Sequence, residues 1–161
     1  MFYAISGLLL LVSVATEYAW PPWLYIRAAR PELTLVAVLS IGLMRGPMAG
    51  VVAGFCGAYL GASIGSLPMG GEFITLMGIG LLAGLLRGGL FSSRITVAVV
   101  ASFVGSLAAW LINLILTPPA EPLTWLRLMI LTALSTAVWS IPVFALFRAV
   151  GNRFAGDTDV Q

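Results

Sequence analysis

Residues 43–65 read LMRGPMAGVVAGFCGAYLGASIG, and this stretch decides the fold. After Arg45 it carries no charged side chain, and it has about the 20 residues that a helix needs to cross a membrane. Glycines recur along it at four-residue intervals, in two sets that fall on different faces of a helix: Gly46, Gly50 and Gly54, then Gly57, Gly61 and Gly65. We therefore predict a membrane helix that packs on two sides and lies centrally.

Glycines at this spacing form grooves in which a second helix backbone can approach closely. Gly80 and Gly84 repeat the spacing in a later apolar stretch. Packing within the chain is the first interpretation of these grooves. The alternative is that one of them receives a helix from a partner protein.

The composition places the chain in a membrane. Of its 161 residues, 60% are hydrophobic and 9% are charged, and the mean hydropathy is +1.06. Soluble domains have about 25% charged residues. Eight arginines and six acidic residues could not cover so much apolar surface in water. We predict a polytopic membrane protein with a single integral membrane domain over residues 1–161.

Charged residues and prolines divide the chain into six predicted membrane helices. These lie near residues 2–17, 31–45, 46–66, 71–87, 94–117 and 123–148, and a short tail follows at 149–161. Because every backbone polar group in lipid needs an internal partner, we predict an all-α bundle. Arg45-Gly46-Pro47 predicts a tight hairpin between the second and third helices, since proline suits the first turn of a new helix. One helix of about 35 residues with a break at Gly46-Pro47 is the alternative.

The arginines predict the orientation. With the amino terminus inside, the cytoplasmic loops and tail hold five arginines and the outer loops hold three. This distribution favours both termini in the cytoplasm. The first helix lacks a basic region before it, so we interpret it as a retained helix and not as a signal peptide. The linker 17–31 combines aromatic residues with arginines, which is typical of a membrane interface.

The polar residues indicate no reaction chemistry. The chain has no histidine and one cysteine, Cys56, which excludes a disulfide within the chain and a cysteine-based metal cluster. The acidic residues lie in loops, at helix ends or in the tail, without the local spacing of an acid/base pair or a metal site. The arginines form no basic stripe for nucleic acid. We predict that the protein is not an enzyme and needs no metal, cofactor or nucleic acid.

Polar and aromatic side chains gather on the last two predicted helices. Those that could line a small-molecule cavity are Ser102, Ser106, Trp110, Asn113, Thr136 and Trp139. Ser135 and Ser140 lie on the same stripe of the last helix. Hydroxyls and amides in membrane helices usually bond to a neighbouring helix, which is the first interpretation. A cavity open to one side is the alternative.

Several short motifs resemble a known family. RPELTLV at 30–36, LMRGPMAG at 43–50, GFCGAYLG at 54–61 and SLPMG at 66–70 are similar to MreD, the bacterial rod-shape-determining membrane protein. The residues that carry the resemblance are Pro31, Glu32, Arg45, Pro47, Phe55, Pro68 and Gly70. Glu32 stands where the family usually has aspartate. Ala62 or Ser63 stands where many members have an aspartate, so no role of that acid is carried over.

The resemblance implies a non-catalytic scaffold in the bacterial cytoplasmic (inner) membrane that supports lateral peptidoglycan synthesis and cell shape. It implies the single-span protein MreC as a direct partner within the lipid bilayer. It implies the MreB filament, the RodA glycosyltransferase and its transpeptidase as indirect partners. The family is also similar in fold to the substrate-binding subunits of energy-coupling-factor (ECF) vitamin transporters. A vitamin-type substrate-binding subunit is therefore the alternative function.

Overall fold

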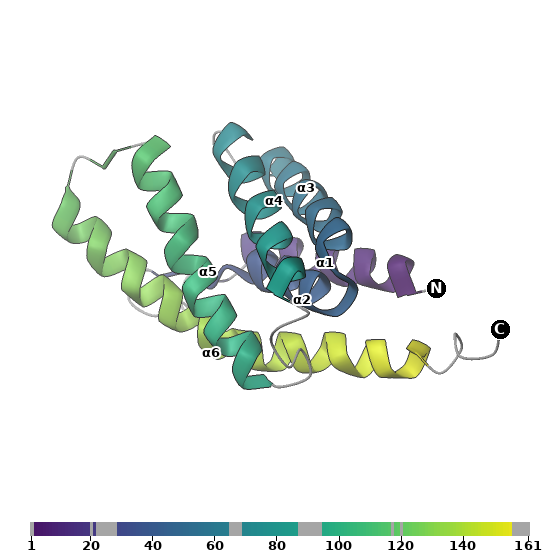
Figure 1. The fold of residues 1–161 in the computed structure, drawn as a ribbon. Helices are drawn as coiled ribbons and strands as arrows, with labels where there is room; N and C mark the ends of the chain where they lie inside the picture. Colours follow the sequence, from purple (N-terminus) through teal and green to yellow (C-terminus); the bar gives the residue numbers. More distant parts are fainter. Residues whose placement is uncertain are drawn as a thin grey trace.

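The computed structural model describes residues 2–19, 21, 29–64, 69–86, 95–116, 118–119 and 121–155. The elements within these residues are all helices, as predicted: α1 (Phe2–Tyr18), α2 (Leu33–Arg45), α3 (Pro47–Ile64), α4 (Met69–Leu86), α5 (Ile95–Leu116) and α6 (Pro122–Ala155) (Figure 1). By length and hydropathy, α3, α5 and the Pro122–Val150 part of α6 can each cross a membrane, whereas α1, α2 and α4 are shorter apolar helices. The chain is therefore an all-α protein with helices of membrane-spanning length.

A tight turn joins α2 to α3. Gly46 has a φ of 95°, a conformation that side chains other than glycine rarely adopt. Its N–H donates to the carbonyl of Gly42 over 2.8 Å and closes α2, and α3 begins at the next residue, Pro47. The predicted hairpin is confirmed, and the alternative of one long helix is wrong because the positive φ at Gly46 ends the first helix.

The enclosed helix of the bundle is α2. Every residue from Leu33 to Leu43 is buried, and α2 contacts each of the five other helices. Leu35 and Leu39 enter one core cluster, while Val38 and Ile41 enter another. A helix that is apolar all round suits burial on every side.

The expectation that the third helix lies centrally is wrong. It does pack on two sides, as predicted, against α4 and against α2. Its remaining face is exposed, however, at Met48, Val52, Phe55 and Tyr59. Large apolar side chains on that face suit contact with lipid, whereas α2 has no such outward face.

The glycines of α3 and α4 bring the two helix backbones into direct contact. A Cβ atom at Gly50 would collide with the carbonyl of Gly80, and one at Gly84 would collide with Pro47. At Gly54 a Cβ atom would lie 2.5 Å from the carbonyl oxygen of Leu76. The grooves formed by these glycines are therefore filled by helices of the same chain, which is the first of the two interpretations.

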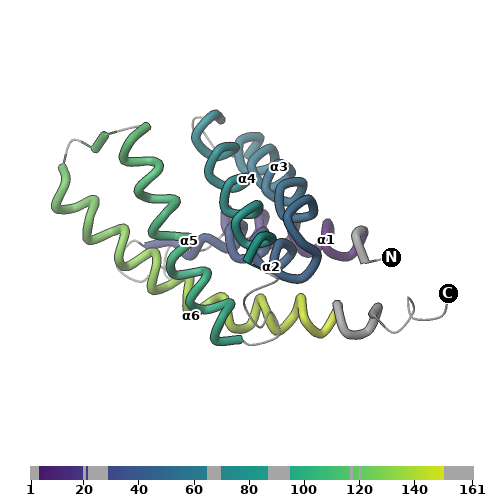
Figure 2. Tube along the Cα trace, in the orientation of Figure 1, coloured from purple at the N-terminus to yellow at the C-terminus, as the bar shows by residue number. Residues whose placement is uncertain are grey.

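The two longest helices pair at the other side of the bundle. Figures 1 and 2 show α5 beside the first part of α6, and α3 beside α4. Pro142 lies inside α6, where it removes one backbone hydrogen bond, and the helix changes direction along its length. The helix continues past Arg148 to Ala155, into the segment predicted as a tail. A charged residue ends an apolar span but does not end a helix.

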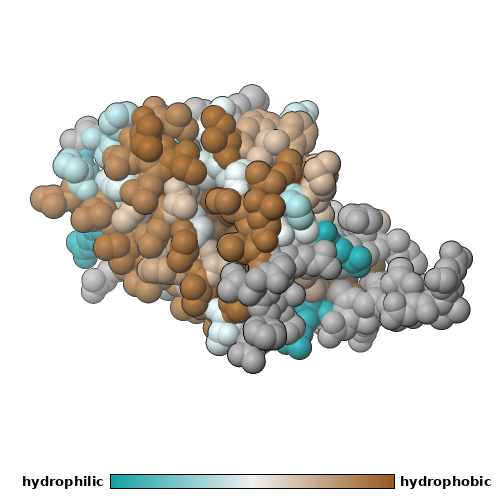
Figure 3. Space-filling model, viewed as in Figure 1, coloured by the Kyte–Doolittle hydropathy of each residue, from teal (hydrophilic) through white to brown (hydrophobic). Residues whose placement is uncertain are grey.

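The outer surface of the bundle is largely apolar. Figure 3 shows hydrophobic residues over much of the face formed by α4, α5 and α6. Exposed leucine, isoleucine and valine side chains occur on each of these helices, among them Leu82, Val104 and Leu134. Such a surface is suited to the hydrocarbon region of a membrane.

The close approach of α3 and α4 predicts different effects for two alanine substitutions on one helix. Gly80→Ala places a methyl group against the backbone of Gly50, so we expect it to lower the stability of the purified protein by about 1–3 kcal/mol. Gly78→Ala meets nothing within 4 Å, so we expect unchanged or higher stability. Thermal unfolding in detergent measures both, and equal unfolding temperatures for the two variants would contradict the packing.

Candidate functional site

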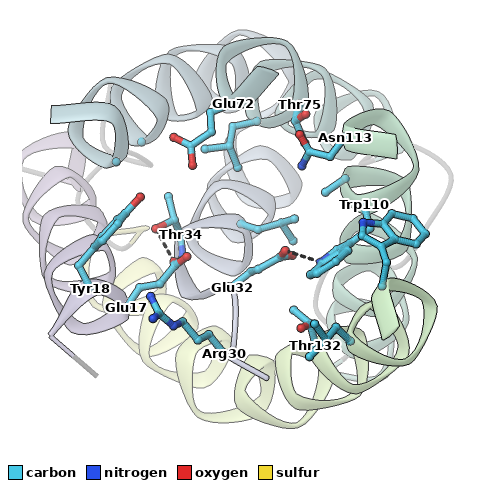
Figure 4. Close-up of a pocket in the computed structure, with 17 residues that line it drawn as sticks. Glu17, Tyr18, Arg30, Glu32, Thr34, Glu72, Thr75, Trp110, Asn113 and Thr132 are labelled. Carbon is cyan, nitrogen blue, oxygen red and sulfur yellow. Dashed lines mark hydrogen bonds between the residues drawn. The ribbon is translucent and has the colours of Figure 1, made fainter. Parts of the chain in front are cut away.

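A cavity of about 440 Å³ lies at one end of the bundle (Figure 4). Its polar and aromatic lining includes Glu17, Tyr18, Arg30, Glu32, Thr34, Glu72, Thr75, Trp110, Asn113, Trp125 and Thr132. Its volume is in the range of small-molecule sites, about 300–1,000 Å³. The lining residues come from all six helices and from the segment before α2.

The direction of each helix explains why these residues meet. Lining residues of α1, α3 and α5 lie in the second halves of those helices, such as Gly61 and Asn113. Lining residues at the start of α2 and in α4 and α6 lie in the first halves, such as Thr34 and Glu72. The helices therefore run alternately up and down, and the cavity lies at the end where α1 leads to α2, α3 to α4 and α5 to α6.

A carboxylate from α1 caps the start of α2. The first backbone N–H groups of a helix lack partners within the helix. Glu32, the residue before α2, makes no side-chain cap. Instead, Oε2 of Glu17 accepts hydrogen bonds from the Thr34 backbone N–H over 2.8 Å and from the Thr34 hydroxyl over 2.7 Å. Negative charge at a helix N-terminus is also favoured by the helix dipole.

Glu32 ties the same end of α2 to α5 and α6. Its carboxylate accepts hydrogen bonds from the Ser106 hydroxyl over 2.7 Å and from Trp110 Nε1–H over 3.0 Å. Its backbone N–H donates to the hydroxyl of Thr136 over 3.0 Å. One residue thus joins three helices, and Figure 4 shows its carboxylate facing Trp110 in the cavity.

Two polar atoms of α4 have no hydrogen-bond partner in the part of the chain that the structure describes. These are Glu72 Oε2 and Thr75 Oγ1, and both atoms are buried. The two residues are three positions apart on the helix, so they lie on neighbouring parts of one face. Glu72 and Thr75 both line the cavity. Buried polar atoms normally have hydrogen-bond partners. This pair therefore marks the part of the cavity in which a ligand could supply the missing partners.

Two tryptophans form an aromatic wall. Trp110 of α5 and Trp125 of α6 meet edge to face, with ring centroids 5.5 Å apart. Figure 4 shows Trp110 on one side of the cavity, with Tyr18, Glu17 and Arg30 on the opposite side. The cavity therefore has a charged side and an aromatic side.

Of the predicted polar stripe, Trp110 and Asn113 line the cavity, and Ser106 contacts it through Glu32. Ser102 and Thr136 are buried, Thr136 against Glu32, and Trp139 is half-buried.

The expected bonds to a neighbouring helix are confirmed for Ser106 and Thr136 but not for Ser135 and Ser140. Ser135 and Ser140 donate to carbonyls of their own helix, those of Thr132 and Ala137. Short hydroxyl side chains bond readily to the preceding turn, which explains the difference.

The glycines singled out in the sequence serve two purposes. Gly46 forms the turn, and Gly50, Gly54, Gly80 and Gly84 lie at contacts between helix backbones. Gly57 and Gly61 line the cavity instead, beside Thr34 and Glu72. Gly65 lies outside the described residues.

The family-motif residues fall at both ends of α2 and on the surface. Pro31 and Glu32 precede the helix, while Arg45 ends it and Pro47 starts the next one. Phe55 is exposed on α3 and packs against Phe73, with ring centroids 5.2 Å apart. Gly70 is exposed on α4, and Pro68 lies outside the described residues.

The sequence did not reveal that Glu17, Glu32 and Glu72 converge. They are far apart along the chain, so no local spacing connects them. The signal that could have found them is position: Glu17 lies in the last turn of the first helix, Glu32 precedes the second and Glu72 lies in the first turn of the fourth. In an alternating bundle these three positions meet at the same end.

The cavity side chains can recognise a ligand through hydrogen bonds and charge. Among the residues that the structure describes, no group of three or more histidine, cysteine or acidic side chains is arranged to hold a metal ion. Two of the carboxylates already accept hydrogen bonds from the protein. The third, Glu72, has an oxygen free to accept one from a ligand.

Comparison with known proteins identifies no relative: no family model, no curated protein and no solved structure matches the chain.

The hydrogen bonds of Glu32 predict that its oxygen atoms, as acceptors, contribute more to the stability of the protein than its charge does. Glu32→Ala would leave Ser106 and Trp110 without an acceptor, so we expect a loss of about 1–3 kcal/mol in stability. Glu32→Gln keeps an acceptor for Trp110 and should lose much less. Glu121→Gln, at an exposed carboxylate that accepts a hydrogen bond from Thr124, is the control for the loss of charge. Thermal unfolding in detergent measures all three, and an unchanged Glu32→Ala protein would contradict the assignment.

Proposed function

We propose that this chain is a polytopic membrane protein and a non-catalytic scaffold of the bacterial elongation machinery, the function of the MreD family that it resembles. The observation that carries the proposal is the place of the shared motifs. Pro31-Glu32 and Arg45-Gly46-Pro47 flank α2, the helix that contacts all five others. The resemblance therefore falls on the residues that organise the bundle.

The contacts of these residues support a common architecture. Glu32 joins α2 to α5 and α6. The Gly46-Pro47 turn packs closely against Gly84 of α4. Short motifs built from common membrane residues can coincide by chance on a surface. Motif residues at helix junctions are constrained by the fold, which makes them stronger support for the family than their number alone.

We further propose that all six helices cross the cytoplasmic membrane and that both termini lie in the cytoplasm. The apolar outer surface and the alternating helix directions support this topology. With that orientation the cavity lies toward the outer face of the membrane, because the loops at that end are the ones that follow α1, α3 and α5.

A single-span partner of the MreC kind would contact the outside of the bundle. The described glycine grooves are filled by the chain's own helices, so they do not offer a docking surface. The partner helix would instead pack on exposed apolar side chains. Through that partner the scaffold would reach the MreB filament, the RodA glycosyltransferase and its transpeptidase.

The cavity favours a second candidate function. A cavity of about 440 Å³ with carboxylates, an arginine and two tryptophans suits a small molecule more than a purely structural bundle. A substrate-binding subunit of an energy-coupling-factor transporter would use such a cavity. Its partners would be a membrane coupling subunit and ATPase subunits.

Purification from native membranes separates the two functions. We expect a carboxy-terminal green fluorescent protein fusion of the full chain, extracted in mild detergent, to retain a single-span coiled-coil protein and wall-synthesis enzymes, identified by mass spectrometry. The fusion also reports orientation, because this fluorophore matures in the cytoplasm and a cytoplasmic carboxy terminus predicts fluorescent cells.

An unrelated six-helix membrane protein with the same fusion is the control for non-specific capture. Recovery of ATPase subunits without wall-synthesis proteins would contradict the scaffold and support the transporter subunit. Dark cells with full-length protein in the membrane would contradict the proposed orientation.

A further inference from the structure

The ligand that the cavity would take can be inferred from its side chains. Three carboxylates line it, from Glu17, Glu32 and Glu72, against one guanidinium among the described lining residues, that of Arg30. When these groups are ionised, the cavity carries net negative charge. An anionic ligand would be repelled, whereas a cation would be attracted most strongly where the surroundings exclude water.

Among the three carboxylates, Glu72 has the buried oxygen without a hydrogen-bond partner in the described part of the chain. Glu17 is engaged by Thr34, and Glu32 is engaged by Ser106 and Trp110. Oε2 of Glu72 is buried and has no partner. Burying a carboxylate oxygen without a donor is costly, so this atom calls for an N–H or O–H group from outside the chain.

Thr75 adds an independent indication at the same place. Its side chain is 4% exposed, it lines the cavity, and its hydroxyl has no hydrogen-bond partner. A threonine hydroxyl in a helix can donate to the carbonyl of the preceding turn, as Ser13 and Thr16 do in α1. Thr75 makes no such bond. Its hydroxyl and Glu72 therefore present two unsatisfied groups one helical turn apart.

Gly61 brings the backbone of α3 close to Glu72 and Tyr18. A Cβ atom at Gly61 would lie 3.0 Å from Glu72 Oε2 and 3.2 Å from the hydroxyl of Tyr18. The carboxylate oxygen of Glu72 and the hydroxyl oxygen of Tyr18 therefore lie close to the same point beside Gly61. A small polar group could contact both oxygens there. Figure 4 shows Glu72 and Tyr18 on the side of the cavity away from Trp110.

We propose that the cavity binds a molecule that carries a primary ammonium group, with the ammonium at Glu72 and Thr75 and the apolar part against Trp110 and Trp125. A primary ammonium has three N–H donors, so it can serve more than one oxygen atom. A quaternary ammonium has none and would leave the two atoms of α4 unpaired. The tryptophans supply an apolar face and can also attract a cation.

Two sources can supply this group: a free amine from solution, or the ethanolamine headgroup of a membrane lipid. The inference rests on the cavity side chains. It names the ligand class of the second candidate function and does not depend on the scaffold. Failure to bind an amine would not change which proteins are recovered in the purification. Recovery of unexpected proteins would likewise not change whether the cavity binds an amine.

Three probes of matched size and different charge test the free-amine source. We expect 2-phenylethylamine to quench the tryptophan emission of the purified full-length protein saturably and to raise its unfolding temperature. 2-Phenylethanol, which lacks the charge, should bind at least about tenfold more weakly, and phenylacetate should not bind. Equal responses to all three probes would overturn the proposal.

Variants locate the ammonium. We expect Glu72→Gln and Thr75→Val each to weaken 2-phenylethylamine about tenfold or more, whereas Glu121→Gln at an exposed carboxylate should bind as the original chain does. Gly61→Ala narrows the space without changing charge and should also weaken binding, which keeps the test valid if Glu72→Gln does not fold. Undiminished binding to folded Glu72→Gln or Gly61→Ala protein would overturn the proposal.

Nanodiscs test the lipid source. If an ethanolamine headgroup is the ligand, the protein should unfold at a higher temperature in phosphatidylethanolamine than in phosphatidylcholine, and Glu72→Gln should abolish the difference. Added 2-phenylethylamine should then compete with the lipid headgroup in phosphatidylethanolamine nanodiscs and not in phosphatidylcholine nanodiscs. No response to the amine in detergent together with no difference between the two lipids would overturn the proposal for both sources.

Discussion

The structure depends on how the buried start of α2 satisfies its backbone. A helix enclosed by five others cannot leave its first N–H groups to water, so neighbouring helices must supply acceptors. Glu17 of α1 accepts from Thr34, and Thr136 of α6 accepts from Glu32. The carboxylate of Glu32 in turn binds α5. Satisfying one helix end thus fixes the positions of three other helices around it.

The opposite end of α2 is fixed by backbone contact. The Gly46 turn brings α3 back along α2, and glycines on α3 and α4 let those two backbones meet. One end of the bundle is therefore tightly closed by small residues. At the other end, polar and aromatic side chains lie between the helices, and the cavity lies among these side chains.

Most of the fold could be predicted from the sequence, whereas the site could be predicted only in part. Uncharged stretches predicted the helix bounds to within two residues except at the end of α6, and Gly46-Pro47 predicted the hairpin, because both are local properties. The enclosure of α2 and the bond from Glu17 to Thr34 depend on which helices are neighbours in space. The polar stripe did lead to Trp110 and Asn113, since helical spacing alone places them on one face.

The most direct test of this account is a disulfide between the first turn of α2 and α3. A Cβ atom at Gly57 would lie 3.0 Å from Cγ2 of Thr34, so cysteines there can meet the Cβ separation of a disulfide, about 3.5–4.5 Å. The test uses a protein in which Cys56→Ser removes the native thiol and Thr34→Cys and Gly57→Cys introduce two new ones. Oxidation should join the two new cysteines, and the mass of the intact protein should then show no free thiol. Thr34→Cys with Gly78→Cys should stay reduced, because Gly78 has no neighbour within 4 Å. A folded first pair that keeps both thiols free would contradict the placement of α2.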